Sequence, residues 1–281
     1  MSTSLPRTVL AYQHNAKLYT LSTLITSITP FHQLAEASRQ LFKTAPDEGS
    51  LVVTTAETIF HPQGGGQPSD TGSITSPSDD GARFDVSAVR MDVVNDGVVL
   101  HLGRFADPAK TFVAGAPATQ AIDVDKRLLY SRLHTAGHVL GAAVRHLLEH
   151  EIAGFDELKA SHFPDSAACE FQGLIEGKWK EPIQKRVDDY VARAMPVEIE
   201  FWDESDFRRE GLERLIPRDD EGVKLPGPGE KFRVVRIVGA EAYPCGGTHV
   251  DTTGLCGNVG VKKISRNKGT SRVSYNVSST L

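Results

Sequence analysis

The sequence predicts an α+β fold, in which a region of short β-strands is followed by a region where helices and strands are mixed. Two observations lead to this fold class. Up to about residue 114, apolar and β-branched residues form short runs between turn signals such as Asn95-Asp96-Gly97. After Ile122 the spacing of apolar residues changes from two to nearly four, which is the period of a helix. We therefore expect two domains, residues 1–116 and 117–281.

The bulk composition narrows the class of protein. The chain has 281 residues and is 40% hydrophobic, which is enough to form real cores in one large or two ordinary domains. The sequence shows neither the long apolar run of a membrane span nor the continuous apolar segment of a secretory signal. Three cysteines, an odd and small number, argue against a disulfide framework and for a reducing, cytoplasmic location. The net charge of −5 argues against holding nucleic acid through overall charge, although a local basic patch remains open.

The N-terminal region is expected to hold a succession of short strands that form a small barrel or a sandwich. The expected elements are strands near 17–21, 51–56, 84–91 and 98–102, turns at 79–81 and 95–97, and a short helix within 31–42.

A glycine-rich segment interrupts these strands. Gly64, Gly65 and Gly66 are adjacent and are followed by Gln67 and Asp70. Adjacent glycines let the backbone come very close to another group. A plain hairpin loop is the alternative, and it is the more common meaning of such a cluster.

The C-terminal region opens with a long amphipathic helix for which Asp123 or Asp125 is the expected N-cap. Further along we expect strands at 170–174, 197–202, 232–238, 259–264 and 272–277, helices at 179–195 and 203–215, and a polar loop at 217–228.

The long helix carries the first half of a candidate metal site. His134 and His138 are four residues apart, so that their imidazoles lie on one face of a helix, one turn apart. Far downstream, Cys245 and His249 are also four apart, with two glycines between them. Two histidines from a helix, with a cysteine and a histidine from a loop, form a ligand set that suits Zn²⁺.

Other histidines and cysteines in the chain are weaker candidates for metal ligands. His146 and His150 repeat the four-residue spacing on the same helix, and we expect them to be exposed and without a role. Cys256 and Cys169 are alternative thiols, but neither is paired with a histidine, and a small buried cysteine is usually inert.

Two further questions stay open at this level. Gly137 and Gly141 lie beside the histidines, and they either keep a surface bare for a ligand or allow close packing against a neighbouring element. Four protein ligands usually mean a closed, structural zinc, whereas a catalytic zinc keeps one position for water or substrate. No glutamate follows His134, which excludes the zinc-protease arrangement.

The two metal motifs resemble those of a known family. His-Thr-Ala-Gly-His at 134–138 and Cys-Gly-Gly-Thr-His at 245–249 are similar to the zinc motifs of the editing domain of alanyl-tRNA synthetase. This domain also occurs as free-standing AlaX proteins, and a related one occurs in threonyl-tRNA synthetase. The runs at 64–72 and 263–275 resemble the alanyl branch, from which His61 departs because the family usually has tyrosine there. Because no aminoacylation domain precedes residue 1, the chain looks like a medium-length, free-standing AlaX protein.

The resemblance implies a β-barrel-like N-terminal domain and a two-layer α/β editing domain with zinc. It also implies an aminoacyl-tRNA deacylase that hydrolyses the ester of Ser-tRNA(Ala) and spares Ala-tRNA(Ala), with Gly-tRNA(Ala) as a second candidate substrate. The partner would be tRNA(Ala) carrying a wrong amino acid. The expected substrate-binding residues are Gly65, Gly66, Gln67, Asp70, Thr248, Lys268 and Arg272, and the expected metal ligands are His134, His138, Cys245 and His249.

Within this set, Thr248 and Gln67 are candidates to bind the serine hydroxyl. Lys268 and Arg272 belong to a basic cluster, completed by Lys262, Lys263 and Arg266, that either meets RNA phosphates or forms a solvated strand edge. Two alternatives to editing remain: a zinc hydrolase of another ester or aminoacyl-tRNA, and a non-catalytic RNA-binding module with structural zinc. The sequence leaves the oligomeric state undetermined.

Overall fold

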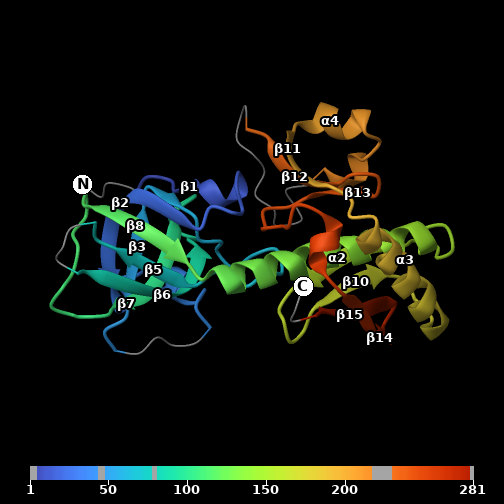
Figure 1. Cartoon of the computed structure of the whole chain (residues 1–281), viewed down its shortest axis with the longest axis horizontal. Helices are drawn as coiled ribbons and strands as arrows, with labels where there is room; N and C mark the ends of the chain where they lie inside the picture. Colours follow the sequence, from blue (N-terminus) through green and yellow to red (C-terminus); the bar gives the residue numbers. More distant parts are fainter. Residues whose placement is uncertain (1–4, 44–47, 78–80, 217–229, 279–281) are drawn as a thin grey trace. The chain divides into compact units, whose positions relative to one another are not determined.

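The computed structural model describes residues 5–43, 48–77, 81–216 and 230–278 (Figure 1). The expected turn at residues 79–80 and the expected loop at 217–228 lie outside these ranges. The chain forms two compact units, Met1–Leu129 and Tyr130–Leu281. The division between the units falls after Leu129, within the long helix α2 (Val124–Leu148), and the domain boundary expected after residue 116 stays a prediction. Among the described residues, no helix is long and apolar enough to cross a membrane.

Unit 1 is built on a closed barrel of six antiparallel strands in the order β2-β3-β7-β6-β5-β8. Their bounds are β2 (Thr20–Pro30), β3 (Leu51–Thr55), β5 (Gly72–Thr75), β6 (Arg83–Met91), β7 (Val99–Phe105) and β8 (Pro117–Ile122). The barrel-or-sandwich alternative is thus decided in favour of the barrel. Strand β8, which the sequence did not reveal, closes it by pairing with both β2 and β5.

The barrel core follows from alternation along the strands. In β6, Phe84 and Val86 point inward and are buried, while Arg83 and Asp85, which alternate with them, are exposed. The buried cluster also includes Ile25, Val53, Ile59, Phe60, Ile74, Val99 and Ile122. A short parallel pair, β1 (Val9–Leu10) with β4 (Glu57–Thr58), lies outside the barrel sheet.

The helix expected within 31–42 is much shorter than predicted. The segment forms a 3₁₀ turn at Phe31–Gln33 and a single α-helical turn, α1 (Glu36–Arg39). The residue that precedes α1 is Ala35, whose side chain cannot accept a hydrogen bond from the first N–H groups of a helix.

Unit 2 combines two antiparallel sheets with three helices, which confirms the expected α+β class. The first sheet has the order β14-β15-β10-β9, and the second has the order β11-β12-β13. The bounds are β9 (Asp156–Ser161), β10 (Ala168–Gln172), β11 (Val197–Trp202), β12 (Phe232–Ile237), β13 (Glu241–Pro244), β14 (Val259–Asn267), β15 (Thr270–Val277), α3 (Lys180–Ala192) and α4 (Glu204–Arg209). Strands β9 and β13 were not foreseen.

Helices α2 and α3 form a layer against the first sheet. Tyr275 of β15 donates from its hydroxyl to the carbonyl oxygen of Leu133 in α2, at 2.9 Å. Cys169 of β10 donates from Sγ to the carbonyl oxygen of Gly137, at 3.4 Å. On α3, the Gln184 amide bonds the backbone of β14. These contacts fix the face of α2 that bears the two histidines of the candidate metal site.

Candidate metal centre

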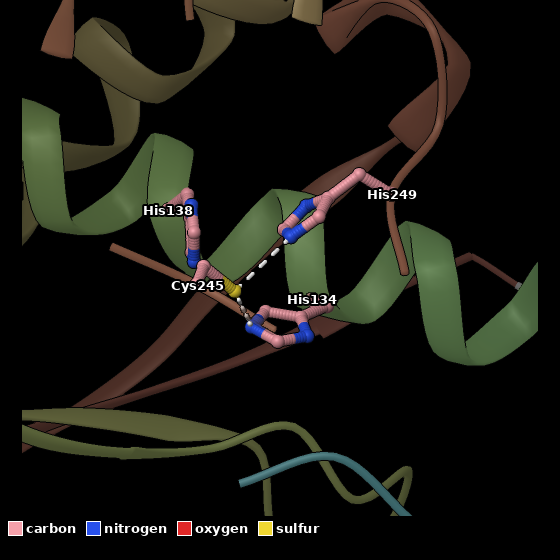
Figure 2. A group of neighbouring side chains, drawn as sticks. All are labelled: His134, His138, Cys245 and His249. Carbon is pink, nitrogen blue, oxygen red and sulfur yellow. Dashed lines mark hydrogen bonds between the residues drawn. The ribbon is translucent and has the colours of Figure 1, made fainter. Parts of the chain in front are cut away.

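The four expected metal ligands come together in unit 2. His134 and His138 lie one turn apart on α2, and Cys245 and His249 belong to the segment that follows β13 (Figure 2). Their potential ligand atoms all lie within 4.8 Å of one another. The Cys245 Sγ atom is 3.4 Å from Nε2 of His134 and 3.4 Å from Nε2 of His249.

Backbone contacts hold the cysteine in place. The Cys245 N–H donates to the carbonyl oxygen of Arg233 on β12, at 3.1 Å. The Arg233 guanidinium in turn donates to the carbonyl oxygen of Cys245, and the Gly247 N–H points at Sγ from 3.4 Å. The thiol is therefore positioned by the β12–β13 hairpin rather than by the ligand histidines alone.

The electrostatics of the cluster suit a cation. Burial lowers the pKa of His138 to about 3, with smaller contributions from His162 and Arg233, so the ring is neutral and keeps the lone pair of one nitrogen at neutral pH. Burial raises the pKa of the Cys245 thiol, although Arg233 and the Gly247 N–H oppose this. A bound cation would favour the thiolate directly.

A buried ring nitrogen without a hydrogen-bond partner also indicates that the cluster suits a cation. Among the described residues, Nδ1 of His138 is one of three buried side-chain atoms that have no hydrogen-bond partner. Buried polar atoms without hydrogen-bond partners are rare in folded proteins. The His138 ring lies among three other side chains of the types that bind zinc, and an unpartnered ring nitrogen is expected in such a ligand group. The donor set of three imidazoles and one thiol therefore fits zinc.

Thr135 supports one ligand from behind. Its Oγ1 lies 3.1 Å from Nδ1 of His249 and accepts the N–H of Val250 at 3.2 Å. Because Nε2 of His249 faces Cys245, this contact suits the tautomer in which Nδ1 carries the proton and Nε2 offers the lone pair. Sequence reasoning missed this residue, although its position directly after His134 is a usable signal.

His162 is the second residue that sequence reasoning missed. It follows β9, is 2% exposed, and stacks on His134 with 4.1 Å between ring centroids. Its Nδ1 lies 2.7 Å from the hydroxyl of Tyr275. Burial lowers the pKa of His162 to about 4, so this ring too is neutral at neutral pH.

The two helical glycines are close-packing positions. A Cβ on Gly137 would lie 2.3 Å from Cε1 of His162, and one on Gly141 would lie 2.7 Å from Oε2 of Glu157 and 3.1 Å from the hydroxyl of Tyr243. Of the two alternatives for these glycines, the structure therefore supports packing. Gly137 is what lets the His162 ring lie against the helix beside the metal ligands.

The glycine-rich segment forms a tight turn in unit 1. The N–H of Gln67 donates to the carbonyl oxygen of Gly64 at 2.9 Å, and the reverse bond is 3.2 Å long. Between them, Gly65 and Gly66 have φ angles of 54° and 77°, a conformation that other residues rarely adopt. Gln67 is fully buried, whereas Gly65 is exposed.

Asp70 is buried at the base of this turn. Its carboxylate forms an ion pair with Arg127, which is itself 1% exposed, and accepts the N–H of His61 at 2.6 Å. Arg127 also donates to the carbonyl oxygens of Ala16, at 2.7 Å, and Ile59. The contacts of Asp70 are thus those of a residue that holds the glycine-rich turn in place.

The remaining expected substrate-binding residues lie in unit 2. Thr248 is fully buried, and its hydroxyl lies 2.8 Å from that of Ser131. Lys268, with a φ of 46°, occupies the exposed turn between β14 and β15. Arg272 donates to the carbonyl oxygen of Ser166 at 2.9 Å and lies 3.6 Å from Glu170. Its charge is therefore partly balanced, unlike that of the exposed lysine.

Among the described residues, the alternative ligands lie outside the four-residue cluster, and His150 lies beyond the end of α2 rather than on it. Cys169 and Cys256 are buried, and burial raises the pKa of both thiols, that of Cys256 to about 12. His146 and His150 are both exposed, and the former contacts the hydroxyl of Tyr190 at 2.6 Å.

Comparison with known proteins identifies the family. Residues 232–274, which include Cys245 and His249, match the family described as the threonyl and alanyl tRNA synthetase second additional domain. The alanyl-tRNA editing protein AlaX-M of Methanosarcina barkeri is 30% identical over 220 residues, covering 78% of this chain and 85% of the relative. The chain belongs to the AlaX family.

Longer members and relatives match over the same region. AlaX-L of Pyrococcus horikoshii is 28% identical over 83% of this chain and 52% of the relative. The alanine--tRNA ligase of Methanothrix thermoacetophila is 31% identical over 81% of this chain and 23% of the ligase. The chain thus spans about half of AlaX-L and about a quarter of the ligase.

Proposed function

We propose that this chain is a trans-editing deacylase that hydrolyses the ester of Ser-tRNA(Ala) and spares Ala-tRNA(Ala). The observation that carries the proposal is the convergence of three histidines and one cysteine in a member of the AlaX family. The reaction class would be hydrolysis of a carboxylic ester, and the partner would be tRNA(Ala). We expect it to act in the cytoplasm, because aminoacylated tRNA is used there.

Zinc is the proposed cofactor, held by His134, His138, Cys245 and His249. When bound, zinc supplies a Lewis acid that polarises a carbonyl group or activates a water molecule. The chain contributes the orientation of the ligands. Thr135 supports one tautomer of His249, and the hairpin contacts of Arg233 fix the position of Cys245.

For the substrate we propose two kinds of contact. In unit 1, the turn formed by Gly65 and Gly66 would contact the tRNA substrate, with Asp70 holding that turn and Gln67 buried beside it. Lys268 and Arg272, on the β14–β15 hairpin, would contact tRNA phosphates. Lys268 is the stronger candidate, since Glu170 partly balances the charge of Arg272.

Discrimination between serine and alanine would rest on the serine hydroxyl. A site whose polar groups bond a hydroxyl disfavours the analogue that lacks it, because those groups then stay unpaired. Thr248 is the proposed contributor from the metal-binding segment. Its hydroxyl already contacts Ser131, so its part would be to complete a hydrogen-bond network around the substrate.

The test is deacylation of Ser-, Gly- and Ala-tRNA(Ala) by protein of measured zinc content. We expect rapid loss of the seryl ester while the alanyl ester survives. His138→Ala should abolish this activity, and the control His150→Ala, which changes an exposed histidine just beyond the end of α2, should not change it. Wild-type rates in zinc-replete His138→Ala would show that the site is wrongly assigned.

A structural zinc in a non-catalytic RNA-binding module is the competing function, since all four ligands come from the protein. Chelation separates the two. A structural zinc should unfold unit 2 when removed, whereas a catalytic zinc should leave the circular dichroism largely intact while activity is lost.

A further inference from the structure

The polar side chains around the metal centre differ in one respect, namely whether they still offer a hydrogen-bonding atom. The hydroxyls of Thr248 and Thr135 are bonded to Ser131 and to His249 with Val250, respectively. The hydroxyl of Tyr243 is buried and has no hydrogen-bond partner among the described residues. His162 is bonded to a described residue through only one of its two ring nitrogens, and it differs from Thr248 and Thr135 in this respect.

The protonation of the His162 ring follows from its neighbours. The hydroxyl of Tyr275 has one proton, and it is donated to the carbonyl oxygen of Leu133 at 2.9 Å. The same oxygen must therefore accept the proton of Nδ1 of His162, which lies 2.7 Å away. A neutral ring with its proton on Nδ1 presents a bare lone pair at Nε2. That atom is not among the fully enclosed unpartnered atoms of the described residues.

The position of the ring puts this lone pair beside the metal ligands. The His162 ring is stacked on that of His134, and its centroid lies 6.4 Å from that of His138. Gly137 makes this position available, since any Cβ there would overlap the ring. An acceptor of fixed tautomer thus lies next to the centre at which the proposed substrate reacts.

We propose that Nε2 of His162 accepts a hydrogen bond from the side-chain hydroxyl of the seryl ester, and that this contact selects serine over glycine and alanine. The inference rests on the proposed function and names a further specificity residue of that site, beside Thr248. Glycine and alanine carry no donor for this lone pair, so the acceptor would be desolvated without a partner when they bind.

Two substitutions separate the acceptor from the packing of the ring. In His162→Gln the side-chain amide reaches the position of Nε2 and can present its oxygen there. In His162→Asn the amide reaches only the position of Nδ1, so the contact with Tyr275 is kept and the acceptor is lost. Both variants remove the aromatic stack on His134 equally, which makes each the control for the other.

The experiment measures kcat/KM for seryl and glycyl esters of tRNA(Ala), together with zinc content. His162→Asn should lower the seryl value about 3- to 10-fold, the effect of one neutral hydrogen bond, and should not lower the glycyl value, because the glycyl ester no longer leaves an acceptor unpaired. His162→Gln should keep most of the seryl preference. Equal losses for both esters, an unchanged ratio in His162→Asn, or loss of zinc from both variants would each overturn the proposal.

A binding measurement separates this inference from the proposed function. Non-hydrolysable 3′-amide analogues of seryl- and alanyl-adenosine are titrated into the zinc-loaded wild-type protein and into His162→Asn. We expect the wild type to prefer the seryl analogue and the variant to lose that preference. If the wild type hydrolyses no ester, the proposed function fails, and equal binding of the two analogues then refutes the role of His162 as well.

Discussion

Gly137→Ala is the substitution that most directly tests how helix α2, which carries two of the candidate metal ligands, is packed. Glycine lies in the middle of α2, where alanine is ordinarily the better residue by about 1 kcal/mol. Helix propensity alone therefore predicts that the variant is more stable than the wild type. The tertiary structure predicts the opposite.

The magnitude follows from three contacts. The new Cβ would lie 2.3 Å from Cε1 and 2.5 Å from Nδ1 of His162, and 2.7 Å from the hydroxyl of Tyr275. Overpacking of this kind costs about 1–3 kcal/mol. Moving the imidazole away also breaks its hydrogen bond to Tyr275, at about 1 kcal/mol. After the gain in helix propensity, we expect the free energy of unfolding to fall by about 1–3 kcal/mol.

The assay is urea unfolding followed by circular dichroism, with Gly177→Ala as the control. Gly177 is exposed, and a Cβ there would meet nothing within 4 Å. That variant should be neutral or more stable by about 0.4–1 kcal/mol, because it restricts the unfolded chain. A second control is Gly137→Ala combined with His162→Ala, in which the clashing ring is gone and the cost specific to Gly137→Ala should largely disappear.

One result would refute this reasoning. If Gly137→Ala were as stable as Gly177→Ala or more so, the His162 ring would not lie against the helix at this position. The inference about its Nε2 would then lose the geometry on which it stands.

Three further outcomes are expected. Asp70→Asn leaves the buried charge of Arg127 unpaired and should lower the free energy of unfolding by about 3–5 kcal/mol. The double variant that also carries Arg127→Met should recover part of this loss. A loss below about 1 kcal/mol in Asp70→Asn would contradict a buried ion pair. Cys245→Ser should weaken zinc retention at least about tenfold in a chelator competition, and unchanged retention would remove the thiol from the ligand set. Burial lowers the pKa of His101 from 6.5 to about 4 in the folded protein. Between pH 6.5 and about 4 the unfolded state therefore binds more protons than the folded state, and the free energy of unfolding should fall by up to about 3 kcal/mol as the pH drops through this range. An NMR titration of the His101 ring with a midpoint near 6.5 would contradict this.

Local sequence signals accounted for much of the secondary structure. Strand β6 was expected at 84–91 and spans Arg83–Met91, because its apolar residues alternate over one buried face. Helix α2 was expected from a four-residue period, and the carboxylate of Asp123 caps it by accepting the N–H of Lys126 at 3.1 Å. The signals failed for β9, whose exposed residues show no clean alternation, and for β8, whose alanines and threonines are weakly patterned.

Of the candidate site, the sequence by itself predicted the four candidate metal ligands, which the structure brings together. Spacing by four puts His134 and His138 on one face of a helix, and that depends only on helix geometry. What surrounds the centre was decided by tertiary structure alone. His162 comes from another element and reaches the ligands only because β15 places Tyr275 behind it and Gly137 leaves room in front. Likewise, Asp70 is a polar loop residue in the sequence, and only the approach of Arg127 from α2 makes it one half of a buried ion pair. Such pairings join residues far apart in the chain, so no local period or propensity records them.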